Sequence, residues 1–249
     1  MMFLLDHVVH FVDKPELLIE KTKEMGLHTV NGGKHEMWGT YNSLCYIGLS
    51  YIEFIGIYDR LLFEKSAKQP FTLHETYKKH NFKNGATRIA LRTNDIEKDA
   101  ENMKSFGLEV YGPADFSRTR PDGSVLKWKL LHVGHKDQSL EFPFIIQWEK
   151  GDEDRQAELV ESGMLKAHPA GNLYFQEIVF HCEDFRTAYD WANIFGFGIE
   201  ESSSSVKLNA HNCSFTFKKG TEQISQIVFA GASEEKVVEI EGTQYVFLG

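Results

Sequence analysis

Hydrophobic positions recur in the same arrangement at three places along this chain. Each stretch begins with a short apolar run typical of a strand and continues through Asp, Asn or Glu residues suited to begin a helix. It ends with an amphipathic helix, Gly and a large apolar residue. The three stretches cover residues 5–27, 87–108 and 177–197. Because internal repetition shows that one supersecondary unit was copied, the repeat predicts the architecture before any single motif does.

Alignment of the copies identifies equivalent polar positions in their first strands. When the copies are superimposed without a gap on Gly26, Gly107 and Gly196, the equivalent residues are His7, Arg88 and Glu177. Function is expected at such positions, since the copies place them alike. The next polar residue of the first strand, His10, is expected to lie half-exposed on the opposite face from His7.

Further apolar runs follow each predicted helix. The runs at 42–49 and 50–58 are separated by almost nothing, which predicts a tight hairpin. In the second copy, Asp122-Gly123 gives a turn signal before the run at 125–134. The order strand, helix, strand, strand, strand predicts an α+β fold of repeated βαβββ modules.

The spacing of the copies predicts the domain organisation. The segments are a first module (1–60), a linker (61–85), a second module (86–150), a further linker (151–170) and a third, modified module (171–249). We expect the third module to pack beside the first two, completing a pseudo-dimer or mediating a homodimer. A lone module would leave an open sheet edge and face.

Composition limits the classes of function. The chain has 249 residues and a net charge of -9, which argues against a nucleic-acid surface. No apolar run approaches the length of a membrane helix, and the N-terminal residues read as a first strand rather than a signal peptide. Cys45, Cys182 and Cys213 lack metal-type spacing and are expected to be buried free thiols. A cytoplasmic protein without nucleic-acid or membrane partners is expected.

Motifs in the first two modules carry a family resemblance. The first strand contains Asp6-His7 in the pattern xDHxxxxxxD, and the hairpin that closes module one contains Glu53 in YIEFI. The segment 33–42 reads GxHxxWGTxN, and 143–148 reads PFIIQW. With the doubled module, these motifs resemble the vicinal oxygen chelate superfamily (glyoxalase, bleomycin-resistance and extradiol-dioxygenase-like proteins) and, within it, the glyoxalase-like domain branch.

The resemblance covers about 1–150 well and the third copy in part. It implies that two modules face each other with curled sheets and form a cup. In metal-dependent members, the first and last strands of each module each supply one side chain to a divalent ion. The ion then binds vicinal oxygens of a substrate.

The positions of the resemblance nominate three metal ligands: His7, Glu53 and Glu141. Glu141 in SLEFPF matches Glu53 in YIEFIG, and a carboxylate in an apolar strand needs a partner. One imidazole and two carboxylates with open positions suit Mn, Fe, Ni, Zn or Mg. No sequence motif indicates an organic cofactor.

Arg88 departs from the metal-binding pattern, because many relatives have His or Gln there and a guanidinium cannot ligate a metal. Two alternatives stay open. Either the three nominated residues hold a metal, or a metal-free cup has Arg88 as its electrostatic centre. In the second case Arg88 pairs with Glu53 or Glu141, or binds an anionic substrate.

The turn after the second predicted strand supplies candidate ligand contacts. His35 is the best general base, since a histidine pKa can lie near neutrality, and Glu141 is a second catalytic candidate. Trp38 could give a flat ligand an apolar wall, and Thr40 and Asn42 could donate hydrogen bonds to it. The alternative is a loop held together by its own polar side chains.

Two arginines in the second module suggest an anion clamp. Arg118 and Arg120 would project the same way from an extended segment and bind an anionic substrate. Solvated surface charge is the alternative.

These features favour a glyoxalase/dioxygenase-like enzyme, either a lyase, an isomerase or a dioxygenase. It would act on a small oxygenated or anionic metabolite through a divalent metal. The alternative is a metal-free small-molecule binding or resistance protein centred on Arg88. A scaffold with an ion-paired remnant of the site is the third hypothesis. The partners of Arg88 discriminate among them.

Overall fold

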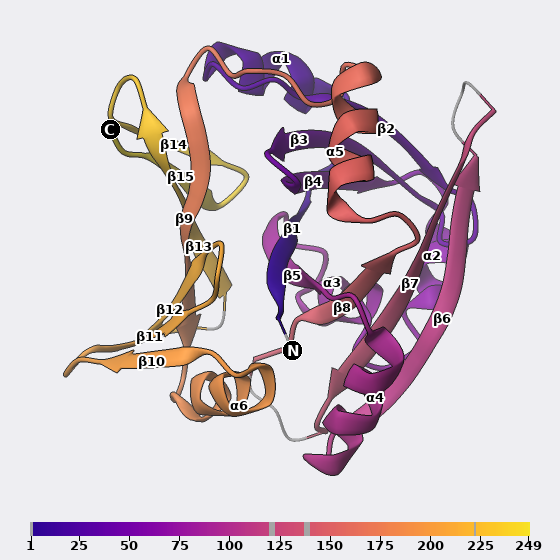
Figure 1. Cartoon of the computed structure of the whole chain (residues 1–249), viewed down its shortest axis with the longest axis vertical. Helices are drawn as coiled ribbons and strands as arrows, with labels where there is room; N and C mark the ends of the chain where they lie inside the picture. The colour runs from indigo at the N-terminus through magenta and orange to yellow at the C-terminus, as the bar shows by residue number, and fades with distance from the viewer. Residues whose placement is uncertain (1, 120–122, 137–139, 222) are drawn as a thin grey trace.

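The computed structural model describes residues 2–119, 123–136, 140–221 and 223–249 and contains two β-sheets (Figure 1). The first sheet has eight strands in the order β2-β3-β4-β1-β5-β8-β7-β6. Their bounds are β1 (Leu4–Phe11), β2 (Val30–His35), β3 (Thr40–Ile47), β4 (Ser50–Ile57), β5 (Gly85–Arg92), β6 (Glu109–Thr119), β7 (Val125–Gly134) and β8 (Phe144–Trp148). The predicted α+β fold of repeated βαβββ modules is confirmed.

Each of the first two modules is closed by a parallel pair of strands. β1 pairs with β4, and β5 pairs with β8, while β1 and β5 join the modules as an antiparallel pair. The module helices are α1 (Leu17–Glu24) and α4 (Ile96–Ser105). Asp95 caps α4 by accepting a hydrogen bond from the Lys98 backbone, and the helix buries Ile96, Ala100 and Met103.

The second sheet repeats this pairing. Its seven strands lie in the order β10-β11-β12-β9-β13-β15-β14. Their bounds are β9 (Gly171–Cys182), β10 (Gly198–Glu201), β11 (Ser205–Asn209), β12 (Ser214–Lys219), β13 (Gln223–Ala232), β14 (Lys236–Ile240) and β15 (Thr243–Phe247). β9 and β12 are parallel, β9 and β13 antiparallel, and β13 and β15 parallel. Strands β13 to β15 therefore form a fourth, truncated copy that the sequence did not reveal.

The strand registers make four positions equivalent in the two sheets. In the first sheet they hold His7, Glu53, Arg88 and Phe144. In the second sheet they hold, in the same order, Glu177, Thr216, Gln226 and Val246. The Thr216 hydroxyl lies 2.5 Å from a Glu177 carboxylate oxygen, so the second sheet also has two polar side chains in contact at the first pair of positions.

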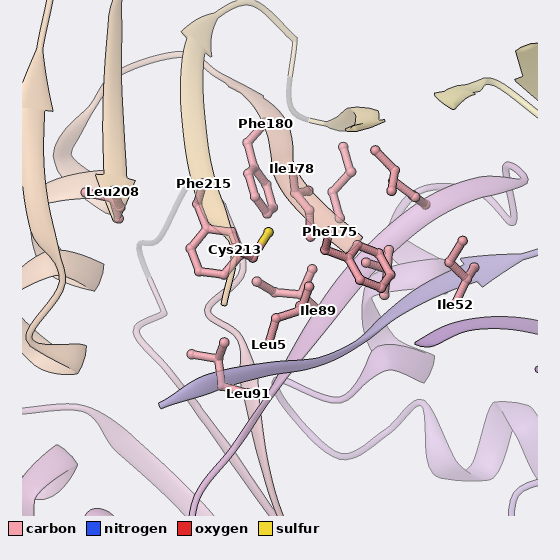
Figure 2. Packing of buried hydrophobic residues seen from close by; sticks show 14 of the residues in the cluster. Leu5, Ile52, Ile89, Leu91, Phe175, Ile178, Phe180, Leu208, Cys213 and Phe215 are labelled. Atoms are coloured by element: carbon pink, nitrogen blue, oxygen red, sulfur yellow. The ribbon is translucent and has the colours of Figure 1, made fainter. Parts of the chain in front are cut away.

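The two sheets share one hydrophobic core between them. Figure 2 shows Leu5 and Ile89 of the first sheet close to Ile178 and Phe215 of the second. Helix α6 (Arg186–Phe195) extends this core with Trp191, whose side chain is fully buried. The outer face of the first sheet is therefore covered by the rest of the chain.

His10 lies at this shared interface. Its Nδ1 atom is 2.7 Å from the hydroxyl of Tyr245 in β15, and the side chain is fully buried. The expectation of a half-exposed histidine was wrong, because the second sheet covers that face of β1. Burial lowers the His10 pKa to about 3, with a smaller contribution from the charge of Lys21.

Three helices lie outside the repeated units. The insert between the first two modules forms α2 (Arg60–Ser66) and α3 (Leu73–Lys79), capped by Asp59 and Thr72. Helix α5 (Asp152–Glu161) connects the two sheets. Within the described residues, none of the helices has the length and apolar content that crossing a membrane requires.

Candidate functional site

A cavity of about 70 Å³ lies on the inner face of the first sheet. On the same measure of volume, a cavity needs roughly 10–15 Å³ to hold one water molecule, so this cavity can hold a small ligand. Most of the lining is apolar, and the larger side chains are aromatic. The lining residues are His7, His35, Trp38, Asn42, Leu44, Tyr46, Tyr51, Glu53, Ile55, Leu73, His74, Arg118, Leu126, Trp128, Leu130, Phe144, Ile146 and Trp148.

His7 is held in this cavity by a buried carboxylate. Its Nδ1 atom lies 2.7 Å from Asp6 Oδ1, and its ring stacks on Tyr51 at a centroid distance of 4.6 Å. Because an ionised carboxylate only accepts hydrogen bonds, we assign the proton to Nδ1. In the neutral ring with this tautomer, the Nε2 atom carries no proton and can act as a base.

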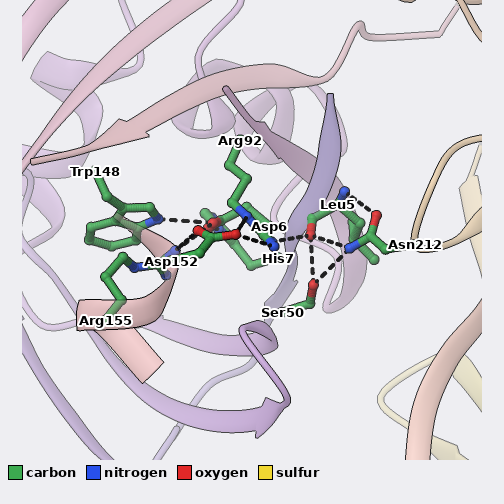
Figure 3. Close-up of polar contacts among 9 residues, drawn as sticks. All are labelled: Leu5, Asp6, His7, Ser50, Arg92, Trp148, Asp152, Arg155 and Asn212. Carbon is green, nitrogen blue, oxygen red and sulfur yellow. Dashed lines mark hydrogen bonds and ion pairs between the residues drawn. The ribbon is translucent and has the colours of Figure 1, made fainter. Parts of the chain in front are cut away.

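Asp6 is fully buried and has three partners, which Figure 3 shows together. Besides His7, it accepts a hydrogen bond of 2.9 Å from Trp148 Nε1, and Arg155 of α5 lies 3.8 Å away. Burial alone would raise the Asp6 pKa. The hydrogen bonds and the Arg155 charge outweigh burial and lower the pKa from its ordinary value, so this carboxylate stays ionised.

Glu53 faces His7 from the neighbouring strand. Parallel pairing of β1 and β4 sets Val9 opposite Glu53, which brings Glu53 Oε2 to 3.8 Å from His7 Nε2. Its other oxygen accepts a hydrogen bond of 2.5 Å from Asn42 Nδ2, and Asn42 Oδ1 accepts one from the Gly33 backbone. The two groups that face the cavity are thus each oriented by a hydrogen bond: His7 by Asp6, and Glu53 by Asn42.

The turn between β2 and β3 supplies another wall of the cavity. His35 Nδ1 is 3.0 Å from the Thr40 hydroxyl, and Trp38 lies with its centroid 5.4 Å from the His35 ring. Thr40 is buried beneath His35 and is not among the lining residues. Burial lowers the His35 pKa to about 4, despite the opposing charge of Glu53, so its ring is neutral near pH 7.

Arg118 of β6 is the cation that lines this cavity. Its side chain is half-buried, and no carboxylate among the described residues lies within 4.0 Å of it. A guanidinium without a carboxylate partner in this part of the chain, beside an apolar cavity, suits an anionic ligand group. Arg120, the second arginine of the predicted clamp, lies outside the described residues.

Glu141 does not join His7 and Glu53. Strand β8 begins only at Phe144, and Ala90 pairs with Phe144 as Val9 pairs with Glu53. The predicted register was wrong by three residues, because it matched two similar Glu-Phe motifs rather than the paired strands. Glu141 instead contacts Lys79 at 3.3 Å and Arg88 at 3.9 Å, outside the cavity.

Arg88 is buried and anchors the insert rather than lining the cavity. Its guanidinium donates hydrogen bonds to the carbonyl of Phe71 (3.1 Å), to the hydroxyl of Thr76 (2.9 Å) and to the carbonyl of Phe142. Burial lowers the Arg88 pKa from its ordinary value, and the charge of Glu141 opposes this effect. The bonds to Phe71 and Thr76 hold α3 and the residue before its cap against β5, and the bond to Phe142 holds the segment before β8 against the same strand.

The residues present do not fit the four-position metal site that the resemblance implies. Module one supplies an imidazole and a carboxylate, but the equivalent positions of module two hold Arg88 and Phe144, which cannot ligate a metal. Among the described residues, no group of three or more His, Cys, Asp or Glu side chains is placed to hold a metal ion. The predicted set of His7, Glu53 and Glu141 is not assembled.

We therefore expect the protein purified without chelator to contain far less than one equivalent of divalent metal. Two protein donors are fewer than the three or four that retain zinc in most proteins. Elemental analysis of the wild type beside Glu53→Ala measures this. Near-stoichiometric Mn, Fe, Ni or Zn that disappears in Glu53→Ala would contradict the expectation.

Sequence reasoning did not assign Asp6, Trp148 or His74 to the site. Asp6 directly precedes His7, so an Asp-His pair was a visible signal for the hydrogen bond between them. Trp148 lines the cavity from β8, and His74 lines it from α3. No signal pointed to His74, because it belongs to the insert and has no equivalent in the other copies.

Comparison with known proteins places the chain in a family. Residues 5–195 match the family model described as a glyoxalase-like domain. The crystal structure of a hypothetical protein from Staphylococcus aureus is similar over 99% of both chains, with a TM-score of 0.88 and 24% identity.

Methylmalonyl-CoA epimerases match a smaller part of the chain. The enzyme from Streptomyces coelicolor covers 60% of this chain and 100% of its own, with a TM-score of 0.44 and 16% identity. The enzyme from Mycobacterium tuberculosis covers 61% of this chain and 90% of its own, with a TM-score of 0.40 and 17% identity. No curated protein sequence matches the chain. On the family match, the chain belongs to the glyoxalase-like domain family.

Proposed function

We propose that the cavity binds a small oxygenated or anionic metabolite and that His7 and Glu53 transfer a proton on it. The observation that carries this proposal is the line formed by Asp6, His7 and Glu53. A buried carboxylate fixes the tautomer of His7, and the free Nε2 atom faces a second carboxylate across 3.8 Å of an apolar cavity. A base oriented in this way beside a proton acceptor is typical of general acid–base catalysis.

The separation of the two groups favours one class of proton transfer. His7 Nε2 removes a proton from a carbon next to a carbonyl group, and Asp6 stabilises the imidazolium that forms. The imidazolium, or Glu53 after it accepts this proton from His7 across 3.8 Å, then returns the proton to a neighbouring atom on the same face of the substrate. This geometry supports an isomerase that shifts a proton between adjacent atoms.

The remaining lining residues supply binding. Arg118 pairs with the anionic group of the ligand, and the aromatic rings, including Trp128 and Phe144, pack against its apolar part. Asn42 keeps Glu53 aimed at the substrate.

Exchange of hydrogen for deuterium on a probe molecule tests the proposal, even though the natural substrate is not identified. Phenylpyruvate is the probe, because it combines an aromatic ring, a carboxylate and exchangeable hydrogens next to a carbonyl. We expect wild-type protein in D₂O to accelerate exchange in the ¹H NMR spectrum. His7→Gln and Glu53→Gln are each expected to slow the catalysed exchange by about 10²-fold or more.

His181→Gln is the matched control, since His181 lies in β9 of the second sheet, outside the cavity lining. This variant should retain the wild-type rate. Wild-type exchange no faster than that of His7→Gln would contradict the enzyme proposal. If phenylpyruvate binds without exchange, the cavity belongs to a binding protein, centred on Arg118 because Arg88 anchors the insert.

A further inference from the structure

The proposed proton transfer creates a negative charge that needs a partner. When His7 Nε2 takes a proton from the carbon next to a carbonyl group, the electron pair of the C–H bond forms a C=C bond. The π pair of the carbonyl group moves onto the oxygen, which becomes an enolate. Hydrogen-bond donors placed in advance stabilise such a charge. Module two holds Arg88 and Phe144 where its metal ligands would lie, so a donor side chain of the cavity is the group to expect.

Tyr51 of β4 presents such a donor to the cavity. Its side chain lines the cavity, and the residue is only 6% exposed. The hydroxyl makes no hydrogen bond within the described part of the chain, yet it is not one of the polar atoms that the fold seals off completely. Because so little of Tyr51 is accessible elsewhere, the accessible surface of this hydroxyl faces the cavity. An unpaired hydroxyl in a buried wall costs stability, which points to a ligand group that accepts its hydrogen bond.

The ring of Tyr51 is held beside the proposed base. Parallel pairing of β1 and β4 sets Tyr51 opposite His7, and their rings stack with a centroid distance of 4.6 Å and an interplanar angle of 19°. The ring of Tyr46 packs against Tyr51 at a centroid distance of 4.9 Å. The carbonyl oxygen of a substrate is only two bonds away from the carbon that loses its proton. A ligand that contacts His7 therefore brings this oxygen to the part of the cavity that Tyr51 lines.

The surroundings of Tyr51 keep its hydroxyl protonated. Burial raises the Tyr51 pKa well above its ordinary value, and the charges of Asp6 and Glu53 raise it further. The charge of Arg155 opposes this effect and is outweighed. Asp6 lies at the Nδ1 atom of His7 and Glu53 at the Nε2 atom. The phenol next to this ring is therefore neutral near pH 7 and can donate a hydrogen bond.

We propose that Tyr51 is a catalytic residue whose hydroxyl donates a hydrogen bond to the enolate oxygen of the substrate. No proton moves along this bond, because the transferred proton is held by His7 or Glu53. The electron pair on the oxygen forms a carbonyl group again when the substrate is reprotonated. The hydrogen bond strengthens as charge develops on the oxygen, so it stabilises the transition state more than the bound ketone. The inference rests on the proposed function, since it names the group that stabilises the charge formed in that reaction.

Tyr51→Phe in the deuterium exchange of phenylpyruvate tests the proposal, because this substitution keeps the stacked ring and removes only the hydroxyl. We expect kcat to fall by about 10²-fold to 10³-fold, the loss that follows removal of one donor to an oxyanion. We expect KM to stay within about 3-fold of the wild-type value, since the hydroxyl acts mainly on the transition state. A Tyr51→Phe variant that retains the wild-type kcat would overturn the proposal.

Tyr245→Phe is the matched control. Tyr245 is also buried, and its hydroxyl also lies next to a histidine, His10, but it is not part of the cavity lining. This variant should keep the wild-type kcat. An equal loss of kcat in Tyr245→Phe and Tyr51→Phe would show that removal of any buried phenol hydroxyl slows the exchange, and it would contradict the assigned role.

Binding of 4-nitrophenol gives a second readout that needs no catalysis. Above its own pKa, this probe is an aromatic oxyanion that resembles an enolate, and nitrobenzene is the same ring without the oxyanion. By calorimetry, we expect Tyr51→Phe to bind the oxyanion about 10-fold to 100-fold more weakly than the wild type, as for loss of one hydrogen bond to a charged group. Both proteins should bind nitrobenzene equally.

The two probes separate the hydroxyl from the shape of the cavity and from the proton transfer. Equal weakening of both probes in Tyr51→Phe, or a wild type that does not bind the oxyanion, would overturn the role of the Tyr51 hydroxyl. A wild type that binds the oxyanion through Tyr51 but does not accelerate exchange would refute proton transfer by His7 and support Tyr51 as the donor to an oxyanion. The two proposals can therefore fail separately.

Discussion

Asp6→Asn is expected to lower the rate of phenylpyruvate exchange by about 10³-fold, within the range that a positioned general base contributes. Asp6 does not line the cavity. The substitution is expected to lower the rate because it changes the tautomer of His7. In the native protein Asp6 accepts two hydrogen bonds, one from His7 Nδ1 and one from Trp148 Nε1.

An asparagine side chain cannot accept both of these bonds through separate oxygens. Its single oxygen satisfies Trp148, and its amide group then donates toward His7 Nδ1. His7 adopts the other tautomer, in which Nε2 carries the proton and no longer acts as a base. The variant should fold, because the side chains have nearly the same shape.

Asp99→Asn provides the control for loss of a buried carboxylate. Asp99 is also buried and also accepts a hydrogen bond, from the Thr93 hydroxyl at 2.5 Å, but it lies on α4 outside the cavity lining. Its exchange rate should match the wild type. An Asp6→Asn variant that is folded and retains more than a tenth of the wild-type rate would refute the assigned role of Asp6.

The free energy of unfolding is expected to fall steeply below pH 6. Burial lowers the pKa of His10, His74 and His132 to about 3 each, and that of His35 to about 4. In the unfolded chain these groups titrate near 6.5. They are neutral in the folded protein but gain protons on unfolding once the pH falls below about 6.5, so their contribution to stability is present above this pH and is lost toward pH 3.

The expected slope follows from these four protons. Each histidine contributes up to about 1.4 kcal/mol per pH unit, and together they remove up to about 5 kcal/mol per unit below about pH 5.5. Since domains are stable by about 5–15 kcal/mol, unfolding is expected within about two to three further pH units.

Urea unfolding at pH 7, 6 and 5 measures this dependence. His132→Phe removes one of these four groups and should reduce the slope between pH 6 and 5 by about a quarter. Equal free energies of unfolding at pH 7 and pH 5 in the wild type would show that these histidines are protonated or exposed in the folded protein.

The repeat made the fold predictable, because each copy has apolar residues and a glycine at the same positions, and these residues form the strands, the buried face of the helix and the turn after it. The structure places His7 and Glu53, which sequence reasoning put together, on neighbouring strands in one cavity. Both belong to module one, in which the strand lengths follow the repeat. Glu141 shows the limit of this reasoning, because only the pairing of β5 with β8 reveals that Phe144 takes the equivalent position.

Side chains whose environment comes from another part of the chain could not be predicted. The burial of His10 depends on Tyr245, which lies more than 200 residues away in the sequence. The contribution of His74 depends on how the insert docks, and that docking depends on hydrogen bonds of Arg88 to backbone carbonyls. Every residue has a backbone carbonyl that can accept a hydrogen bond, so the sequence does not indicate which carbonyls an arginine will bond.

The second sheet suggests how duplication divided the tasks between copies. At the positions of His7 and Glu53 it carries Glu177 and Thr216, without an imidazole. Its apolar outer face packs against the first sheet within the same chain. Substitutions on this apolar face are therefore expected to be limited by the volume of the side chain that must pack between the two sheets. Substitutions on the opposite, polar face of the second sheet are expected to vary more freely.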